Sequence, residues 1–493
     1  MYIKYKIEKK QVSEDNGATW YDVYPMETRN GASAGTYNTY SECVSGTPEP
    51  PITGDTSQYL TFDIVSGGTI VWKARTANAV KTISYSMDNG TTWTEITSST
   101  AGTSFNVSAG DKVLFKGNNT SYGDINGYDY GSAFSGGTAY YNVYNNIMSL
   151  INADNFENLR VLTDNHTFHG LFYASNVINA SGLILPATTL VNACYWGLFY
   201  NCTSLTTAPA LPATTLTGSC YRSMFYNCTG LTTAPALPAT TLADYCYQNM
   251  FFECHSLTTA PALPATTLAN DCYASMFGRC YNLTSAPALP ATAMTESCYD
   301  SMFSECTSLT SAPALPATTL ANRCYSFMFA GCSGLTVAPA LPATTLANLC
   351  YMRMFQNCTS LTSTPSILPA TTLTQNCYDG MFYGCTSLTT APELPATTLA
   401  QYCYANMFEN CTSLTSAPVL PAITLVNFCY QGMFAGCTIL SYIKCLATDI
   451  SAPYCTSSWL NNVSSTGTFV KASNVTWPTG TSGIPSGWTV QNA

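Results

Sequence analysis

The sequence is poor in charged residues. Only 9% of its 493 residues are Asp, Glu, Lys or Arg, against about 25% in an ordinary globular protein. Acidic residues outnumber basic ones by 27 to 17, and the basic residues form no cluster that could hold nucleic acid or an anionic membrane. We therefore expect no nucleic-acid partner, and Ser, Thr and Asn must cover most of the surface.

Long apolar runs and histidines are scarce as well. No stretch approaches the roughly 20 apolar residues of a transmembrane helix, so we expect no membrane insertion. The opening residues Met1–Lys10 alternate charged and apolar side chains, and we expect no export signal from them. Three histidines in the whole chain offer few nitrogen ligands, and we expect no metal site and no cofactor.

Cysteine, in contrast, is abundant and periodic. The string Cys-Tyr-x-x-(Met/Leu)-Phe-x-x-Cys occurs ten times between Cys194 and Cys437, at a spacing of 26 residues and once of 27. A second phrase, roughly Leu-Thr-x-Ala-Pro-x-Leu-Pro-Ala-Thr-Thr-Leu, joins consecutive strings, as in residues 231–242. Such a period predicts a solenoid, because one unit cannot bury its own apolar face and must stack on its neighbours.

Each unit is predicted to contain a short strand, a turn bounded by proline and a helix of about three turns. Leu231–Ala234 suits a strand, Pro235 removes a ladder donor, and Thr240 and Thr241 suit a helix N-cap. Apolar residues then recur every four positions, at Leu242, Cys246, Met250 and Cys254. The predicted fold class is an α/β solenoid of the leucine-rich-repeat type, with about ten 26-residue strand-turn-helix units.

The cysteines are interpreted as core residues. Two cysteines eight positions apart in a helix are about 12 Å apart, too far for a disulfide, and like cysteines of neighbouring units point the same way. We expect reduced thiols that pack as small apolar side chains.

The region before the repeats has the pattern of a small all-β domain of immunoglobulin-like size. Short β-branched or alternating runs are separated by Gly, Asn and Asp turns, at 59–64, 69–74, 81–86, 92–96 and 112–116. Ser86–Trp93, and the similar Ser13–Trp20, resemble the Asp-box hairpin of sialidases and other β proteins. A sialidase's arginine cluster, tyrosine and acid have no visible counterpart, so we interpret both as structural hairpins.

These patterns divide the chain into five parts. We predict an N-terminal attachment segment at 1–48, a β-sandwich at 55–120, a linker and N-terminal cap at 121–165, the solenoid at 166–438 and a C-terminal cap at 439–493. The caps are expected because a solenoid end would otherwise expose its core.

The repeated unit closely resembles the BspA-like leucine-rich repeats of bacterial and phage surface proteins. The shared skeleton is Leu-x-x-(apolar)…Leu-Pro…Phe-x-x-Cys over about 165–440, although these units are longer than is usual in that family. The resemblance implies a binding surface, adhesion to host proteins or cells, and no catalysis.

The two flanks resemble structural proteins of phages that infect gut Bacteroidales, including crAss-like phages. The resemblance is carried by the opening Tyr2–Trp20, with its Asp-Asn-Gly-Ala-Thr-Trp, and by the ending Gly483–Ala493. It implies a virion protein made in the host cytoplasm, a setting that also keeps thiols reduced.

The positions that differ between units are the candidate contact sites. Core columns hardly change, while the residues before and after Cys-Tyr and after Phe vary freely. One interpretation is a solvated face that drifts; the other is a binding surface, because exposed aromatic residues are favoured at binding sites. The threonine-rich phrase could equally bind a repetitive glycan or another fibre chain. The candidate ligand-contact residues are Trp196, Tyr200, Tyr226, Tyr245, Tyr383, Tyr402 and Phe428.

We find no nucleophile–base pair, acid pair or phosphate loop, and expect a non-enzymatic protein with no catalytic residues. The leading hypothesis is a tail or appendage protein on the virion surface that attaches to a host cell-surface glycan or protein and contacts other virion proteins through its N-terminal region. Such a protein is expected to form a homo-oligomer or an array. The alternatives are an exported bacterial adhesin at the cell surface and a purely architectural virion decoration protein.

Overall fold

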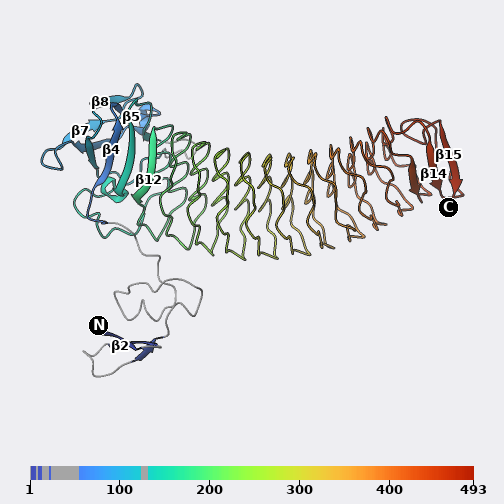
Figure 1. Ribbon diagram of the computed structural model, residues 1–493, viewed down its shortest axis with the longest axis horizontal. Helices are drawn as coiled ribbons and strands as arrows, with labels where there is room; N and C mark the ends of the chain where they lie inside the picture. The colour runs from blue at the N-terminus through green and yellow to red at the C-terminus, as the bar shows by residue number, and fades with distance from the viewer. Residues whose placement is uncertain (1, 7–8, 14–20, 24–54, 124–130) are drawn as a thin grey trace.

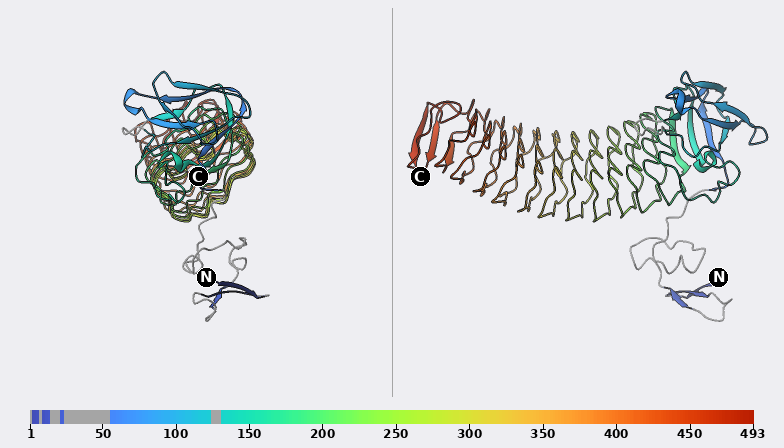
Figure 2. Two further views of the ribbon diagram at one scale, coloured as in Figure 1. Left: turned by 90° about the vertical axis from the view of Figure 1, so that its left-hand side faces the viewer. Right: turned by 180° about the vertical axis from the view of Figure 1, so that it is seen from behind.

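The computed structural model describes residues 2–6, 9–13, 21–23, 55–123 and 131–493. A β-rich domain stands at one end of a gently curved rod of stacked coils, and three strands close the other end (Figure 1). Seen along the rod, the coils superimpose closely (Figure 2). The predicted attachment segment at 1–48 and the Ser13–Trp20 hairpin lie mostly outside the described residues.

The described elements are strands and two short 3₁₀ helices, η1 (Ala77–Ala79) and η2 (Ile147–Leu150). The strands are β1 (Tyr2–Lys6), β2 (Lys9–Ser13), β3 (Tyr21–Val23), β4 (Leu60–Ser66), β5 (Gly68–Ala74), β6 (Thr82–Ser86), β7 (Thr94–Thr97), β8 (Thr103–Val107), β9 (Lys112–Lys116), β10 (Ser132–Phe134), β11 (Tyr140–Asn146), β12 (Val177–Ile184), β13 (Tyr442–Cys445), β14 (Gly467–Lys471) and β15 (Trp488–Asn492).

Two sheets form the β-rich domain. One has the order β12-β11-β4-β9-β6-β7 and the other β10-β5-β8. They face each other through aromatic rings, with the Phe62 and Phe115 centroids 4.8 and 4.9 Å from that of Phe134. The five predicted strands correspond to β4, β5, β6, β7 and β9, while β8, β10 and β11 were not predicted. The domain is a two-sheet sandwich, and a likeness to immunoglobulin domains is not shown.

The sandwich and the solenoid are joined as one hydrogen-bonded structure. Strand β11 pairs with β4 on one side and, in parallel, with β12 of the solenoid on the other. Residues 131–151, which the sequence assigned to a linker, therefore complete both sheets. The sandwich also covers the first coil, since the Phe172 ring lies 6.0 Å from both Phe62 and Phe134.

The predicted helices are wrong. In each unit the segment around the Cys-Tyr string is a spiral of tight turns, which we call the turn ribbon; in the first regular unit it covers residues 193–202. Backbone N–H groups along the ribbon alternate between two kinds of acceptor. One N–H donates to the carbonyl three residues back, as Leu198 N to Tyr195 O at 3.2 Å, and the following N–H donates to a carbonyl of the next coil, as Phe199 N to Met224 O at 2.9 Å. An α-helix would satisfy all of these groups internally. Here half of them hold neighbouring coils together instead.

The helix prediction failed because a repeat of 4.0 residues and the 3.6-residue repeat of a helix look alike over three turns. Every fourth residue of the turn ribbon has a left-handed backbone, with φ of 53° at Ser219, 52° at Ser223 and 54° at Asn227. This repeat places two residues inward and then two outward. Apolar residues therefore recur every 4.0 positions, while a helical stripe averages 3.6. The paired Cys-Tyr and Met-Phe positions are this two-in, two-out pattern.

The predicted strand of each unit is reduced to single parallel bridges. Thr207 bridges Thr233, and Thr215 bridges Thr241, which bridges Thr267. The prolines between these two bridging positions interrupt the ladder, because proline has no N–H to donate. The adjacent threonines at the end of the phrase, such as Thr240 and Thr241, are exposed in most coils. These threonines therefore form a polar ladder along the rod.

The two cysteine columns are buried free thiols, as predicted, but they differ in chemistry. In the second column each S–H donates to a phenylalanine carbonyl of the preceding coil, as Cys280 Sγ to Phe251 O at 3.0 Å and Cys254 Sγ to Phe225 O at 3.1 Å. The first column has no such regular acceptor. Phe and Tyr rings form stacked columns beside the thiols, for example Phe251 on Phe277 at 5.6 Å.

The C-terminal end repeats the coil without repeating its sequence. Tyr454, Ser458 and Asn462 have φ of 55°, 54° and 59°, the left-handed pattern of the turn ribbon. The Trp459 ring is fully buried and stacks on Trp477 at 5.4 Å. The parallel sheet β13-β14-β15 then closes the rod.

The Ser86–Trp93 motif is a hairpin turn between β6 and β7, as interpreted. The Asp88 carboxylate accepts hydrogen bonds from Thr92 N at 2.8 Å and Thr92 Oγ1 at 2.6 Å. These bonds lower the pKa of Asp88 to about 2. The Trp93 ring packs 5.0 Å from Tyr59, so this motif has a structural role.

Candidate functional site

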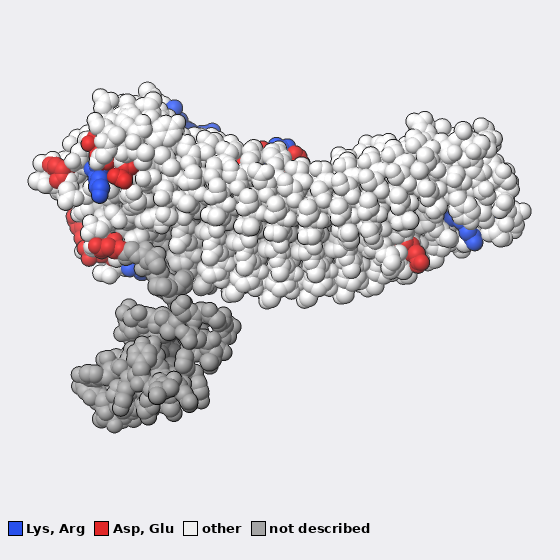
Figure 3. Space-filling model, viewed as in Figure 1, with Lys and Arg blue, Asp and Glu red and all other residues white. Residues whose placement is uncertain are grey.

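The outward residues of the turn ribbons form a continuous surface along the rod, which we call the turn face. In the first regular unit they include Trp196, Gly197, Tyr200 and Asn201. Equivalent residues of adjacent coils lie side by side, so this surface consists of rows. The solenoid carries few charged side chains in the view of Figure 3, and those visible gather mainly at the sandwich end.

One row combines aromatic rings with a cation. The Trp196 ring stacks on His169 at 4.6 Å with an interplanar angle of 8°. The Arg222 guanidinium lies 4.7 Å from the Trp196 centroid and 5.6 Å from that of Tyr245. The structure thus brings two of the predicted contact residues together through an arginine. Tyr245 is 40% exposed, while Trp196 is half-buried.

A second row lies beside the first and contains Tyr200 and Tyr226. Their rings stack at 4.5 Å with an angle of 1°, and Tyr173 and Phe252 extend the row at 5.4 and 5.1 Å. Burial raises the pKa of Tyr200 to about 12. Tyr173 and Phe252 were not among the predicted contact residues.

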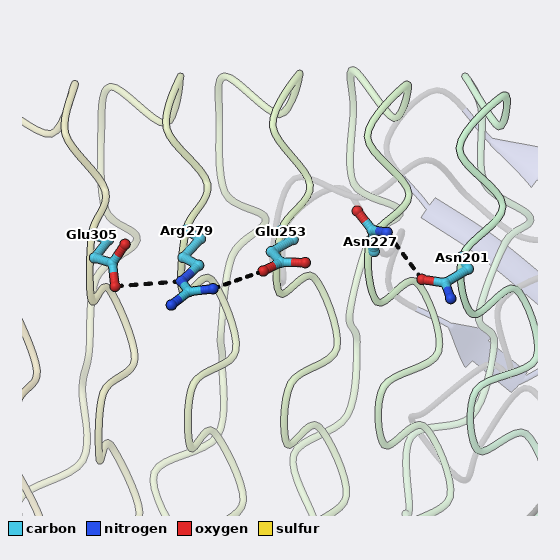
Figure 4. Close-up of polar contacts among 5 residues, drawn as sticks. All are labelled: Asn201, Asn227, Glu253, Arg279 and Glu305. Atoms are coloured by element: carbon cyan, nitrogen blue, oxygen red, sulfur yellow. Dashed lines mark hydrogen bonds and ion pairs between the residues drawn. The ribbon is translucent and has the colours of Figure 1, made fainter.

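A polar ladder follows the second row. Asn227 donates to Asn201 Oδ1 at 3.0 Å, and Arg279 bonds Glu253 at 3.0 Å and Glu305 at 3.3 Å (Figure 4). These side chains come from five consecutive coils, each at the same position of its unit. These partly exposed ion pairs contribute little stability.

Tyr383 stands apart from both rows. Its hydroxyl accepts a hydrogen bond from Asn410 Nδ2 at 3.3 Å, and the Arg353 guanidinium lies 5.9 Å from its ring. Nearby, burial raises the pKa values of the Asp379 and Glu409 carboxyl groups. Tyr383 therefore belongs to a polar cluster.

The other two predicted residues form a third aromatic row near the C-terminal end. Tyr402 stacks on Phe428 at 4.6 Å, and Phe428 stacks on Tyr454 at 5.0 Å. Tyr454 is 65% exposed and was missed, because its unit lacks the Cys-Tyr string. The available signal was its place 26 residues after Phe428 and directly before Cys455.

Several of these residues adopt a strained backbone. Tyr245, Tyr402, Phe428 and Tyr454 have φ of 60°, 56°, 58° and 55°. A bulky side chain is rare in this left-handed region, which favours Gly, Asn and Asp. The same position in the other units holds Ala193, Ser219, Asp271, Ser297, Arg323, Leu349 or Asn376, so the left-handed backbone belongs to the coil, and the coil does not require an aromatic ring there.

An apolar groove that the sequence did not predict is formed by the Ala-Pro-x-Leu-Pro segments of two successive units. It measures about 350 Å³ between two coils and is lined by Ala391, Pro392, Glu393, Leu394, Pro395, Pro418, Val419 and Pro421. Glu393 is the one charged residue in its lining. Val419 in this lining is 47% exposed, and Ile423, four residues farther along the chain, is 60% exposed.

The chemistry of the buried thiols is passive. Burial raises the pKa of Cys194, Cys280 and Cys350 to about 12, so these thiols are protonated at neutral pH, whereas the thiolate is the nucleophile and metal ligand. Within the described ranges, no group of three or more His, Cys, Asp or Glu could hold a metal ion. The same residues contain no helix long and apolar enough to cross a membrane.

Comparisons with known proteins agree with the repeats. The model of the BspA type leucine rich repeat region matches residues 169–310, 219–362, 271–406 and 351–452. A similar solved structure is a leucine-rich repeat protein from Bacteroides ovatus ATCC 8483, with 17% identity, a TM-score of 0.35, and coverage of 72% of this chain and 86% of that one. No curated protein matches. Because the matched residues span more than half of the sequence, the chain belongs to the BspA-type leucine-rich repeat family.

Proposed function

We propose that this protein is a non-enzymatic attachment protein whose turn face binds a glycan or protein on a host cell surface. The observation that carries the proposal is the set of stacked, partly exposed aromatic rings on the turn face, in the rows Tyr200–Tyr226 and Tyr402–Phe428–Tyr454. Exposed aromatic residues are typical of binding surfaces. The fold itself accepts serine or asparagine at the same positions.

The composition of the surface indicates how it would bind. The chain has few charged residues, and Arg279 is already paired with Glu253 and Glu305. Binding would therefore depend on ring stacking and on hydrogen bonds from Asn, Gln and Tyr side chains, with little electrostatic steering. We expect its affinity to change little between low and physiological salt, unlike that of a charged interface.

The location that we propose is the surface of a phage particle, with the N-terminal region contacting other virion proteins in a homo-oligomer or array. The support is the resemblance of Tyr2–Trp20 and Gly483–Ala493 to phage structural proteins. The alternatives are an exported adhesin at the bacterial surface and an architectural decoration protein. Antibodies against the chain should label purified phage particles; labelling of uninfected bacteria alone would favour the adhesin.

The decisive experiment is a cell-binding assay with the purified full chain. We expect Tyr200→Ser combined with Tyr226→Ser to weaken binding at least tenfold. A matched control, Thr240→Ser combined with Thr266→Ser, changes the threonine ladder on the other side of the coil and should bind normally. Absence of binding by the unaltered chain at micromolar concentration would refute attachment and leave the architectural role. Loss of binding only in the control variant would place the site on the threonine ladder.

A further inference from the structure

The row Tyr402–Phe428–Tyr454 ends in a ring whose outer face is uncovered. Each ring occupies the same position in successive coils, at separations of 4.6 and 5.0 Å. Counting 26 residues beyond Tyr454 leads to Gly480. The coil register changes there: Thr456 Oγ1 donates to Ser482 O, 26 residues away, at 2.8 Å, but Leu460 N donates to Thr481 O, 21 residues away, at 3.3 Å. Gly480 carries no ring, and among the described residues the ring that stacks on Tyr454 is that of Phe428.

The space beyond Tyr454 is open. A Cβ placed on Gly480 would meet no atom within 4 Å, and Tyr454 is 65% exposed. Phe428 covers the other face of the Tyr454 ring at an angle of 12°. One ring face is therefore held in a fixed orientation by the stack while the other faces solvent.

The stability of the fold does not explain these rings. A left-handed backbone is unfavourable for a residue with a side chain, and the stacking of an aromatic pair returns a gain of the same order. The two effects offset each other, so Asn or Gly at the three positions would serve the coil equally well. Asn376 occupies the same position one coil earlier, with φ of 54°.

The surroundings of the row favour a neutral, ring-shaped ligand. Exposed amide side chains, Gln401 and Asn427, directly precede Tyr402 and Phe428. Asp449 lies in the coil of Tyr454, and its carboxylate accepts a hydrogen bond from Ser451 Oγ at 2.7 Å. An aromatic side chain of a protein partner would be expected in an enclosed, desolvated pocket. A sugar ring can instead cover the open ring face and keep its hydroxyl groups in water or on the amides.

We propose that the Tyr402–Phe428–Tyr454 row is a carbohydrate-binding platform, on which a neutral pyranose ring stacks against the open face of Tyr454. This inference rests on the proposed attachment function and names its ligand class. It places the sugar at the C-terminal end of the rod, far from the sandwich that closes the first coil.

The test is an array of neutral pyranose oligosaccharides probed with the full chain. We expect binding that falls at least tenfold in Tyr454→Asn, which keeps a residue suited to the left-handed backbone, and that is retained in Tyr454→Trp. The matched control is Leu349→Asn, which makes a change to Asn at the same position of another coil, where φ is 61°, and should bind normally. Circular dichroism verifies that each variant is folded.

The possible results separate the two proposals. Equal glycan binding by Tyr454→Asn and the unaltered chain, or no binding to any neutral glycan, would overturn the platform. If the chain still bound cells through Tyr200 and Tyr226, the attachment function would stand without it. If Tyr454→Asn lost cell binding that protease treatment of the cells abolished and enzymatic removal of their glycans did not, the ligand would be a protein and the inference would be wrong. Glycan binding without cell binding would support the platform and refute attachment.

Discussion

Alkaline pH should unfold the solenoid within a narrow range, because the two columns contain twenty buried thiols. An unfolded cysteine has a pKa of about 8.5, whereas burial raises the pKa of Cys280 and Cys350 to about 12 in the folded chain. The folded state keeps protons that the unfolded chain releases. The free energy of unfolding is therefore little affected at pH 7, and it falls as pH rises toward 8.5 and above it.

The magnitude follows from the number of thiols. Each buried thiol lowers the free energy of unfolding by about 0.8 kcal/mol at pH 9 and about 2 kcal/mol at pH 10. For twenty thiols the loss is roughly 17 kcal/mol at pH 9 and roughly 40 kcal/mol at pH 10. A folded region of about 270 residues is stable by roughly 14–40 kcal/mol. We therefore expect unfolding between pH 9 and pH 10, with the buried tyrosine column acting in the same direction.

The assay is circular dichroism under reducing conditions from pH 7 to pH 11, with thiolate absorbance followed in parallel. Thiolate should form together with loss of structure and not before it. As a control, Cys272→Ala, Cys298→Ala and Cys324→Ala together should lower the number of protons released on unfolding by three, whatever their effect on stability. Retention of the native spectrum at pH 11, or thiolate formation in the native state at pH 9, would refute the reasoning.

Three further predictions concern the fold. Ser275, at φ 53°, should gain about 1 kcal/mol of stability in Ser275→Gly, which removes the Cβ from a left-handed backbone, while Ser275→Ala keeps the Cβ and should change stability little; urea unfolding checks this order, and the reverse order would indicate a helix. Cys280→Ser keeps a donor for Phe251 O, whereas Cys272→Ser buries a hydroxyl without a regular acceptor, so the second variant should be less stable by about 1–3 kcal/mol in urea unfolding; equal stabilities would contradict the two-column assignment. Trp477→Ala uncovers Trp459 and should lower stability by about 3–5 kcal/mol, measured by thermal unfolding, with Tyr245→Ala as a surface control; an unchanged melting temperature would show that the cap does not protect the rod.

Much of the candidate site followed from comparing units within the sequence. The variable columns gave Trp196, Tyr200, Tyr226 and Tyr245, and these lie in two neighbouring rows. Tyr454 was missed because the comparison required the Cys-Tyr string, which its coil replaces by Cys455-Thr456. The groove at Pro392 and Val419 was missed because its lining differs little from the common phrase.

The sequence by itself determined the solenoid, its period and its core, because identical units can bury their apolar residues only by stacking in register. It also determined that the thiols are structural. Tertiary structure alone decided the local conformation. Cys246, Met250 and Cys254 fit both a helix and a turn ribbon, and hydrogen bonds between coils, as from Phe251 N to Met276 O at 2.9 Å, select the ribbon. The union of sandwich and solenoid was likewise decided by pairing between β11 and β12, two strands more than 30 residues apart along the chain.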